Sequence, residues 1–270
     1  MNDWSSAPPP HPRIGPLGWA RALARGLPMA LVTFGGLALL LALRLVEAPL
    51  FGPARPWTPH ITQAVCRLNL RLLGLSRTTT GTPMTARGAV VANHASWLDI
   101  FVLNAGQRIY FVAKAEVAGW AFIGWLARAT GTVFIRRNAA EARDQQRLFE
   151  TRLLSGHQLL FFPEGTSTDS LRVLPFKPTL FQAFFAPDLY RELQIQPVTV
   201  RYIAPRGADP RFYGWWGEMD FAPHLLLTLA ARRQGSVEVI YHPPVPVDAF
   251  DGRKELAAHC ERVVRASHGG

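Results

Sequence analysis

The sequence predicts an α/β domain that follows a pair of membrane-associated helices. From Gly88 onward, short apolar runs of strand length alternate with segments of helical periodicity, which is typical of a sheet covered by helices. Before that residue lies an uncharged stretch, residues 26–43, and then an amphipathic segment. The chain has 270 residues, of which 49% are hydrophobic, so it can form a substantial core.

Residues 1–25 are predicted to form a disordered, basic N-terminus, because they are rich in proline and carry several arginines. The uncharged residues 26–43 follow, and their length is at the short end for a helix that spans a bilayer. A basic start before an apolar stretch resembles a signal peptide. Cleavage is not expected, since no small-residue cleavage site follows and Arg44 and Glu47 interrupt the stretch.

Residues 57–75 are predicted to form an amphipathic helix, since apolar side chains recur at helical spacing with arginines on another face. Arginines flank the uncharged stretch on both sides, and basic flanks favour the cytosolic side of a membrane. We therefore expect residues 26–78 to form a membrane-associated two-helix hairpin that enters one leaflet. The alternative is a single transmembrane span.

Residues 79–270 are predicted to form the α/β domain. The predicted strands cover residues 89–92, 109–112, 132–135, 158–162, 195–200 and 237–241. The predicted helices cover residues 97–104, 119–129, 141–154, 179–186 and 254–265. Strands that alternate with helices indicate one sheet, with its functional groups at the carboxyl ends of the strands.

The formal net charge of +10 comes mostly from arginine. These arginines are scattered among leucine, tryptophan and phenylalanine, whereas nucleic-acid-binding proteins usually have dense basic runs. The composition therefore favours a membrane surface and argues against nucleic acid. Cys66 and Cys260 are far apart and form no Cys-x-x-Cys pair, so neither a disulfide framework nor a zinc site is expected.

His94 and Asp99 stand five residues apart, directly after the first predicted strand. A histidine held by an aspartate is a common general base for a hydroxyl proton at neutral pH. On one continuous helix the two side chains would diverge by roughly 140°, so they can meet only across a turn. Ser96 supplies that turn as the N-cap of a Ser-x-x-Asp capping box. The alternative is that Asp99 only caps a helix and His94 only packs.

Two other predicted strands end in polar groups. Arg136 and Arg137 follow the third predicted strand and would point to opposite sides, so that one of them can bind a phosphate or a carboxylate. Glu164, Gly165 and Thr166 follow the fourth predicted strand and offer an acceptor, a close backbone approach and a hydroxyl. The alternatives are a solvated basic strand end and a tight turn with an exposed glutamate.

The sequence lacks the motifs of several other enzyme classes. It contains no Gly-x-Ser-x-Gly nucleophile elbow, no Gly-x4-Gly-Lys phosphate loop and no His-Glu-x-x-His metal motif. The remaining histidines have no metal-ligand spacing, so no metal site is expected. Lys177 is a lone cation among apolar residues, and the tryptophan-containing residues 215–225 are expected to pack against the domain or the membrane.

Three motifs occur in order along the chain: Asn93-His94-x-Ser96-x-x-Asp99, Gly131-x-x-Phe134-Ile135-x-Arg137 and Phe162-Pro163-Glu164-Gly165-Thr166. In this order they resemble the phospholipid/glycerol acyltransferase family, of the bacterial 1-acyl-sn-glycerol-3-phosphate acyltransferase type, over about residues 60–245. The resemblance implies a glycerol-3-phosphate-acyltransferase-like mixed sheet flanked by helices, on an N-terminal two-helix membrane motif.

The resemblance also implies acyl transfer from acyl-ACP or acyl-CoA to the free hydroxyl of a lysolipid, without a cofactor or a metal. His94 would be the general base and Asp99 its orienting partner. The implied substrate-binding residues are Asn93, Ser96, Arg137 with Arg136 as the alternative, Glu164, Gly165, Thr166 and Lys177. The implied partners are membrane lipids, the lysolipid acceptor and acyl carrier protein or coenzyme A. The implied location is the inner (cytoplasmic) membrane, with the catalytic domain on its cytosolic face.

Departures from the family pattern bear on the acceptor. Ser167 stands where the family usually has arginine, and Pro178-Thr179 stands where the family continues with x-Gly. The loss of that arginine removes one bidentate clamp for a phosphate. These forms resemble the lyso-ornithine lipid O-acyltransferase branch, whose acceptor has no phosphate. We therefore expect lyso-ornithine lipid as the acceptor. The alternatives are 1-acyl-sn-glycerol-3-phosphate as the acceptor and, more distantly, a non-catalytic lipid-binding membrane protein.

Overall fold

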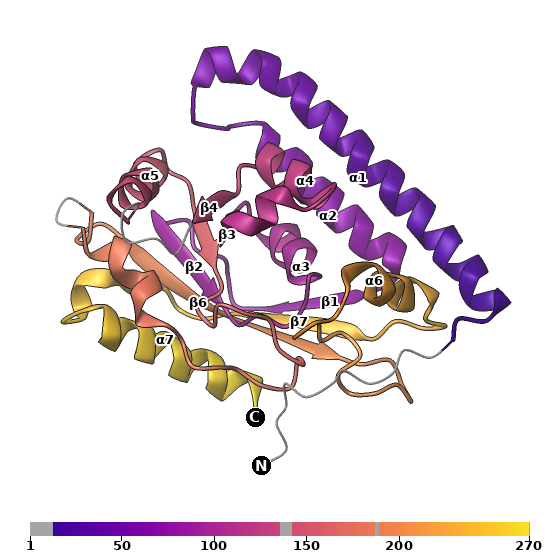
Figure 1. Ribbon diagram of the computed structural model, residues 1–270. Coiled ribbons are helices and arrows are strands. Elements are labelled where there is room, and N and C mark those ends of the chain that lie inside the picture. Colours follow the sequence, from indigo (N-terminus) through magenta and orange to yellow (C-terminus); the bar gives the residue numbers. More distant parts are fainter. Residues whose placement is uncertain (1–12, 136–141, 187–188, 270) are drawn as a thin grey trace.

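The computed structural model describes residues 13–135, 142–186 and 189–269, which form three layers (Figure 1). One face of the central sheet is covered by α1 (Pro16–Phe51), α2 (Thr58–Leu73), α3 (Asp99–Gly106), α4 (Ile123–Thr130) and α6 (Phe221–Ala230). The other face is covered by α5 (Ala142–Leu154), the 3-10 helix η3 (Pro178–Phe185) and α7 (Arg253–His268). Two shorter 3-10 helices are η1 (Ala115–Gly119) and η4 (Val247–Ala249).

The described residues form an eight-stranded sheet. Its order is β1 (Ser76–Thr80), β7 (Ser236–Tyr241), β6 (Gln194–Ile203), β2 (Gly88–Ala92), β5 (Leu159–Phe161), β3 (Tyr110–Lys114) and β4 (Val133–Ile135), with β8 (Val245–Pro246) paired to β6. β6 is antiparallel to β7 and β8, and the other neighbours are parallel. The predicted mixed sheet flanked by helices is therefore confirmed.

Strand β2 lies in the centre of the sheet and is buried on both faces. Val90 and Ala92 belong to the core beneath α1, α2 and α3, whereas Ala89 and Val91 belong to the core beneath η3 and α7. Successive side chains of a strand point to opposite faces, so a strand between two helical layers requires a continuous apolar run. The run ends at Asn93, where the polar cluster begins.

Several elements differ from those predicted. The polar strand β1 lies at the edge of the sheet and lacks the apolar run that identified the other strands. Helix α6 begins at Phe221, inside the segment 215–225 that was expected to pack through its aromatic residues, and it continues to Ala230. η3 is a 3-10 helix in place of an α-helix, and α3 begins at Asp99, two residues later than predicted.

Helix α1 begins earlier than predicted. It starts at Pro16, so the described part of the N-terminus expected to be disordered is helical from that residue. Proline is tolerated there because the first N–H groups of a helix have no intrahelical partner. α1 is long and apolar enough to cross a membrane by length and composition, yet little of its apolar window is buried. Leu27 is 61% and Leu31 is 75% exposed, so α1 is not a core helix.

The N-terminal end of α1 is held against α6. Arg25 donates to the carbonyls of Leu229 (2.8 Å) and Ala231 (2.6 Å), and Arg21 donates to the carbonyl of Ala230 (2.8 Å). These carbonyls lie at the C-terminus of α6, where a cation complements the negative end of the helix dipole. The two arginines therefore fasten the start of α1 to the α/β domain (Figure 1).

The C-terminal end of α1 is held against α2. The Glu47 carboxylate is fully buried and accepts hydrogen bonds from the N–H groups of Trp57 (2.7 Å) and Thr58 (3.0 Å) at the start of α2. Between these ends, α2 lies against α1 at Gly36, where a Cβ atom would collide with the side chain of Val65. α1 is therefore packed along α2 and held near both of its ends, by α6 at the start and by α2 at the end.

Candidate active site

The candidate site lies where the neighbouring parallel strands β2 and β5 end. Val91 is opposite Phe161 in the register of the two strands, so the third residue beyond each, His94 and Glu164, lies at the same level. The backbone N–H of His94 donates to Glu164 Oε1 at 2.7 Å. Parallel strands bring their carboxyl ends to one edge of a sheet, and the sequence motifs after both strands therefore meet there.

His94 and Asp99 are hydrogen-bonded to each other, as predicted. The distance from His94 Nδ1 to Asp99 Oδ2 is 2.7 Å, and Asp99 is fully buried. A carboxylate can only accept, so it assigns the hydrogen to Nδ1 and leaves Nε2 with its lone pair. The His94 side chain is 19% exposed and its ring stacks on Phe162, with ring centroids 3.9 Å apart. The imidazole is therefore fixed in tautomer and in plane.

The chain turns between His94 and Asp99 because Asp99 caps the backbone N–H groups that precede it. Asp99 Oδ2 also accepts hydrogen bonds from the backbone N–H groups of Ala95 (2.9 Å) and Ser96 (3.0 Å). Ser96 Oγ accepts from the N–H of Leu98 at 3.3 Å, and not from the N–H of Asp99 that the capping box predicts. Asp99 thus supplies its half of the box and holds His94 with the same oxygen.

The backbone around His94 is held from three sides. Its carbonyl accepts hydrogen bonds from the N–H (2.9 Å) and the hydroxyl (3.2 Å) of Thr168, while its N–H is bound by Glu164. The next carbonyl, that of Ala95, accepts from the N–H of Trp215 at 2.9 Å. These contacts come from two distant segments of the chain, and they leave His94 little freedom to move.

Glu164 is engaged by the protein backbone, and its predicted contact with the acceptor head stays a prediction. It is 2% exposed, and its second oxygen, Oε2, accepts the N–H of Leu174 at 2.8 Å. Burial raises the pKa of Glu164 to about 8; the N–H groups of Leu174 and His94 oppose this rise, and the charge of Asp99 adds to it. Glu164 therefore ties the end of β5 to the His94 loop.

Two other predicted substrate-binding residues are engaged by the protein itself. Asn93 is fully buried, donates to the carbonyl of Val200 (2.9 Å) and accepts its N–H (2.8 Å), which extends the pairing of β2 with β6 by one side chain. Ser96 is also fully buried, with its hydroxyl on Leu98. Both residues position the loop, and their predicted contacts with substrate stay predictions.

Three of the other predicted residues, Gly165, Thr166 and Lys177, lie close to the end of β5. Gly165 ends a turn in which its N–H donates to the carbonyl of Phe162, and its φ of 73° favours glycine. Thr166 and Lys177 are exposed, and the N–H of Lys177 donates to the carbonyl of Pro163. Arg136 and Arg137 lie outside the described residues.

Tyr202 is a site residue that the sequence did not reveal. Its buried hydroxyl donates to Asp99 Oδ1 at 2.7 Å, and burial beside the Asp99 carboxylate raises the pKa of Tyr202 well above its ordinary value. Tyr202 lies on β6, beyond the end of the strand predicted there, and 103 residues separate it from Asp99. Each oxygen of Asp99 therefore has a donor, and the carboxylate is held rigidly beneath the imidazole.

A second unpredicted contact comes from α6. Trp97 Nε1 donates to His224 Nδ1 at 2.9 Å, in a buried pair that fixes α6 against the turn after His94. Residues 215–225 were expected to pack against the domain, and Trp215 and His224 do so at the site itself. Among the described residues, no group of three or more His, Cys, Asp and Glu side chains is placed to hold a metal ion.

Comparison with known proteins identifies the family. Residues 77–201 match the family model described as Acyltransferase. The chain is 59% identical to the lyso-ornithine lipid O-acyltransferase of Rhodobacter capsulatus, over 98% of this chain and 97% of that protein. It is 38% identical to the protein of the same name from Brucella abortus, over 66% of this chain and 69% of that protein. The 1-acyl-sn-glycerol-3-phosphate acyltransferase of Neisseria gonorrhoeae is 42% identical over 35% of this chain and 37% of that protein.

A solved structure has the same fold. The 1-acyl-sn-glycerophosphate acyltransferase of Thermotoga maritima superposes with a TM-score of 0.66 and 18% identity, over 93% of this chain and 95% of that one. The likeness shows that the two chains share a fold over most of their length. With the sequence identity to named acyltransferases over almost its full length, the chain belongs to the phospholipid/glycerol acyltransferase family and is an acyltransferase.

Proposed function

We propose that this acyltransferase moves a fatty acyl chain from a thioester to the free hydroxyl of lyso-ornithine lipid, with His94 as the general base. The observation that carries the mechanism is the 2.7 Å hydrogen bond between His94 Nδ1 and Asp99 Oδ2, because it leaves Nε2 to accept a proton. Among the described residues His94 is the partly exposed member of the cluster, so it is the group that a substrate can reach.

The proposed reaction needs no covalent intermediate on the protein. The acceptor hydroxyl oxygen attacks the thioester carbonyl carbon while His94 Nε2 takes the hydroxyl proton. The carbon–sulfur bond then breaks, the new ester remains on the lysolipid, and the proton passes from the imidazolium to the departing thiolate. Asp99 stabilises the imidazolium by charge and by its hydrogen bond, and Tyr202 and the loop N–H groups hold Asp99 in place.

The assignment of lyso-ornithine lipid rests on relatives and on one position in the third motif. The relatives from Rhodobacter capsulatus and Brucella abortus both carry that name. Ser167, where an arginine would supply a bidentate phosphate clamp, is 9% exposed and lies directly after the exposed Thr166. An acceptor without a phosphate has no need of that clamp. The acyl donor is proposed to be acyl-ACP or acyl-CoA.

The deciding experiment offers purified enzyme two acceptors, lyso-ornithine lipid and 1-acyl-sn-glycerol-3-phosphate, each with one labelled acyl donor. Parallel reactions with acyl-ACP and acyl-CoA identify the donor. We expect a higher kcat/KM for lyso-ornithine lipid. A preference for the phosphate acceptor would refute the proposed acceptor and leave acyl transfer intact, and it would support the 1-acyl-sn-glycerol-3-phosphate alternative.

Ser167→Arg tests the physical basis of that preference. If the absent arginine sets selectivity, the variant should use the phosphate acceptor better relative to lyso-ornithine lipid than the wild type does, because a guanidinium can form two hydrogen bonds with a phosphate. Ser167→Gln, which adds a long side chain without charge, is the control. An equal change in both variants would mean that the clamp does not explain selectivity.

We infer that the enzyme binds the cytosolic face of the inner membrane through α1, without crossing the bilayer. Support comes from the exposed apolar side chains of α1 and from the bonds that fasten its start to α6, through Arg25, and its end to α2, through Glu47. A helix of 36 residues is about 54 Å long, so a helix crossing the bilayer would separate its ends by more than the membrane thickness.

The topology is tested with tags at both termini in intact cells whose outer membrane has been permeabilised. Both tags should resist added protease, and both should be cleaved once the inner membrane is opened by detergent. A periplasmic marker protein that is digested in the intact cells serves as the control. Cleavage of one tag in intact cells would show that α1 crosses the membrane.

A further inference from the structure

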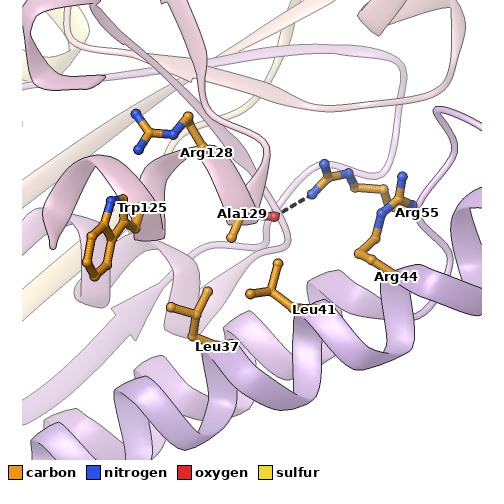
Figure 2. A pocket seen from close by; sticks show the side chains of 7 residues that line it. All are labelled: Leu37, Leu41, Arg44, Arg55, Trp125, Arg128 and Ala129. Carbon is orange, nitrogen blue, oxygen red and sulfur yellow. Dashed lines mark hydrogen bonds between the residues drawn. The ribbon is translucent and has the colours of Figure 1, made fainter. Parts of the chain in front are cut away.

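A hollow between α1 and α4 contains none of the residues that hold His94. Its volume is about 510 Å³, and it opens at the surface between the end of α1, the loop before α2 and the last turns of α4. Figure 2 shows Leu37 and Leu41 rising from α1 as one wall, with Arg44 and Arg55 at one end and Trp125 and Arg128 toward the other. The hollow is thus amphiphilic, with leucines along one side and the guanidinium groups of Arg44 and Arg55 at one end.

The positive charge of this hollow is only partly neutralised by the protein. Arg44 pairs with Glu47 at 3.0 Å. Arg55 donates to the carbonyl of Ala129 at 2.7 Å, and Arg128 donates to the carbonyl of Ala118. Within the described ranges, no carboxylate lies within salt-bridge distance of Arg55 or Arg128. Arg55 and Arg128, which both line the hollow, therefore have no anionic partner among those residues.

Helix capping explains only part of the Arg55 side chain. The carbonyl of Ala129 lies in the last turn of α4, and a cation there complements the helix dipole. That bond uses one nitrogen, NH1, of a guanidinium that has five N–H donors. Burial and the neighbouring charge of Arg44 lower the pKa of Arg55, and Tyr110 and Glu47 oppose that change without forming an ion pair with it.

The hollow is continuous with the apolar surface of α1. Leu41 is 50% and Trp125 is 57% exposed, and Phe122, in the turn before α4, stacks edge-on against both Phe34 of α1 and Trp125. Phe122 has a φ of 62°, a left-handed conformation that is costly for an aromatic residue, and its side chain is 57% exposed. An aromatic side chain held outward next to α1 extends the surface that the enzyme would present to lipid.

We propose that this hollow binds one anionic phospholipid of the surrounding bilayer, with the phosphate against the arginines and an acyl chain along Leu37 and Leu41. Guanidinium groups with free donors select a phosphate, and the leucines and Trp125 require an apolar tail beside it. A free phosphate would leave the leucine wall exposed to water, so the charge and the apolar wall together match an amphiphile. The lipid is a bound structural component that contacts both α1 and α4. It is neither the acyl acceptor nor the acyl donor.

Native mass spectrometry of the full chain, purified in detergent and mixed with equal amounts of phosphatidylglycerol and phosphatidylcholine of identical chains, tests the site. The wild type should retain one phosphatidylglycerol in roughly tenfold preference to phosphatidylcholine. Arg55→Gln with Arg128→Gln should lose that preference. The matched control, Arg206→Gln with Arg262→Gln, removes the same formal charge from exposed positions elsewhere and should keep it.

Three results would contradict the proposed lipid site. Equal loss in the control pair would indicate general charge attraction. Displacement of the lipid by millimolar inorganic phosphate would indicate an ion site, and displacement by lyso-ornithine lipid would indicate the acceptor site. Arg55→Lys with Arg128→Lys keeps the charge without the fork and should retain part of the preference, which gives a second test if the glutamine pair unfolds. Because lipid retention is measured without turnover, its failure is distinguishable from failure of the proposed acyl transfer.

Discussion

The loop from Asn93 to Asp99 and helix α1 satisfy opposite physical requirements. In the loop, polar groups are buried and nearly all have partners: Asp99 is fully buried and accepts from His94, Ala95, Ser96 and Tyr202. In α1, many of the residues that face outward are apolar, and several leucines have more than half of their surface exposed. Burial of a polar group requires hydrogen bonds, and exposure of an apolar face requires a non-aqueous partner. Buried, hydrogen-bonded polar groups therefore build the site, and the exposed apolar face of α1 places that site at a membrane.

His94→Ala should separate these two regions most sharply. We expect kcat to fall by about a thousandfold, because the variant lacks the group that accepts the hydroxyl proton. Association with vesicles should be unchanged, since α1 is untouched. His259→Ala, which removes a histidine of α7, is the control and should keep activity. Turnover of His94→Ala close to that of the wild type would rule out His94 as the base.

Leu27→Glu with Leu31→Glu should produce the converse result. Burial of a leucine contributes about 1.5–3 kcal/mol, so two lost contacts with lipid should weaken vesicle binding by at least about a hundredfold. Both side chains are more than 60% exposed, so the fold should survive, as a circular dichroism melt would verify. Leu148→Glu with Leu171→Glu, at exposed positions outside α1, is the matched pair and should bind normally. Equal binding of the two double variants would show that α1 is not the membrane face.

Glu164→Gln should weaken the site without removing any catalytic group. A glutamine has one acceptor oxygen, whereas Glu164 accepts the N–H groups of both His94 and Leu174, so one N–H would face an NH2 group. The free energy of unfolding should fall by about 1–3 kcal/mol and kcat by roughly tenfold as the His94 loop shifts. Glu192→Gln, at an exposed ion pair with Arg87, should change neither quantity by a comparable amount.

Glu164 also predicts how stability depends on pH. Its pKa is raised from 4.5 to about 8, so between these values the folded protein binds more protons than the unfolded chain. The free energy of unfolding should therefore decrease as pH rises through this window, with a slope of up to about 1.4 kcal/mol per pH unit from this group. Denaturant melts between pH 5 and 8 measure it. A wild-type slope equal to that of Glu164→Gln would contradict the assignment to Glu164.

Tyr202→Phe should have the smallest effect. The variant leaves Asp99 Oδ1 without a donor, so Asp99 becomes a looser support for the imidazole. We expect kcat to fall several-fold at nearly constant KM, with a shift in the pH profile of kcat/KM that a purely structural loss would not produce. Tyr190→Phe, which removes the hydroxyl that accepts from Arg191, is the control. An unchanged pH profile would mean that Tyr202 only supports the fold.

The sequence predicts local geometry better than distant contacts. The His94–Asp99 pair is found from five residues of spacing and a capping pattern, because the turn that joins them lies within the motif itself. Tyr202 on β6 and Thr168 in the loop after β5 reach the same loop from distant parts of the sequence, and no local signal marks them. The family resemblance implied that Asn93, Ser96 and Glu164 bind substrate. It gave no sign of the backbone groups that these side chains contact, because those partners lie on other segments or depend on the local turn.

Fastening α1 at both ends has a consequence for kinetics. An enzyme held along one leaflet receives its lipid substrate by diffusion within that leaflet, and it returns its product there. Its rate should then follow the mole fraction of acceptor in the surface, and dilution with an inert lipid should slow turnover even when the amount of acceptor per volume is constant. The bonds of Arg25 and Glu47 would thus make the surface concentration of the lipid substrate, and not its concentration in the bulk solution, the quantity that sets the rate.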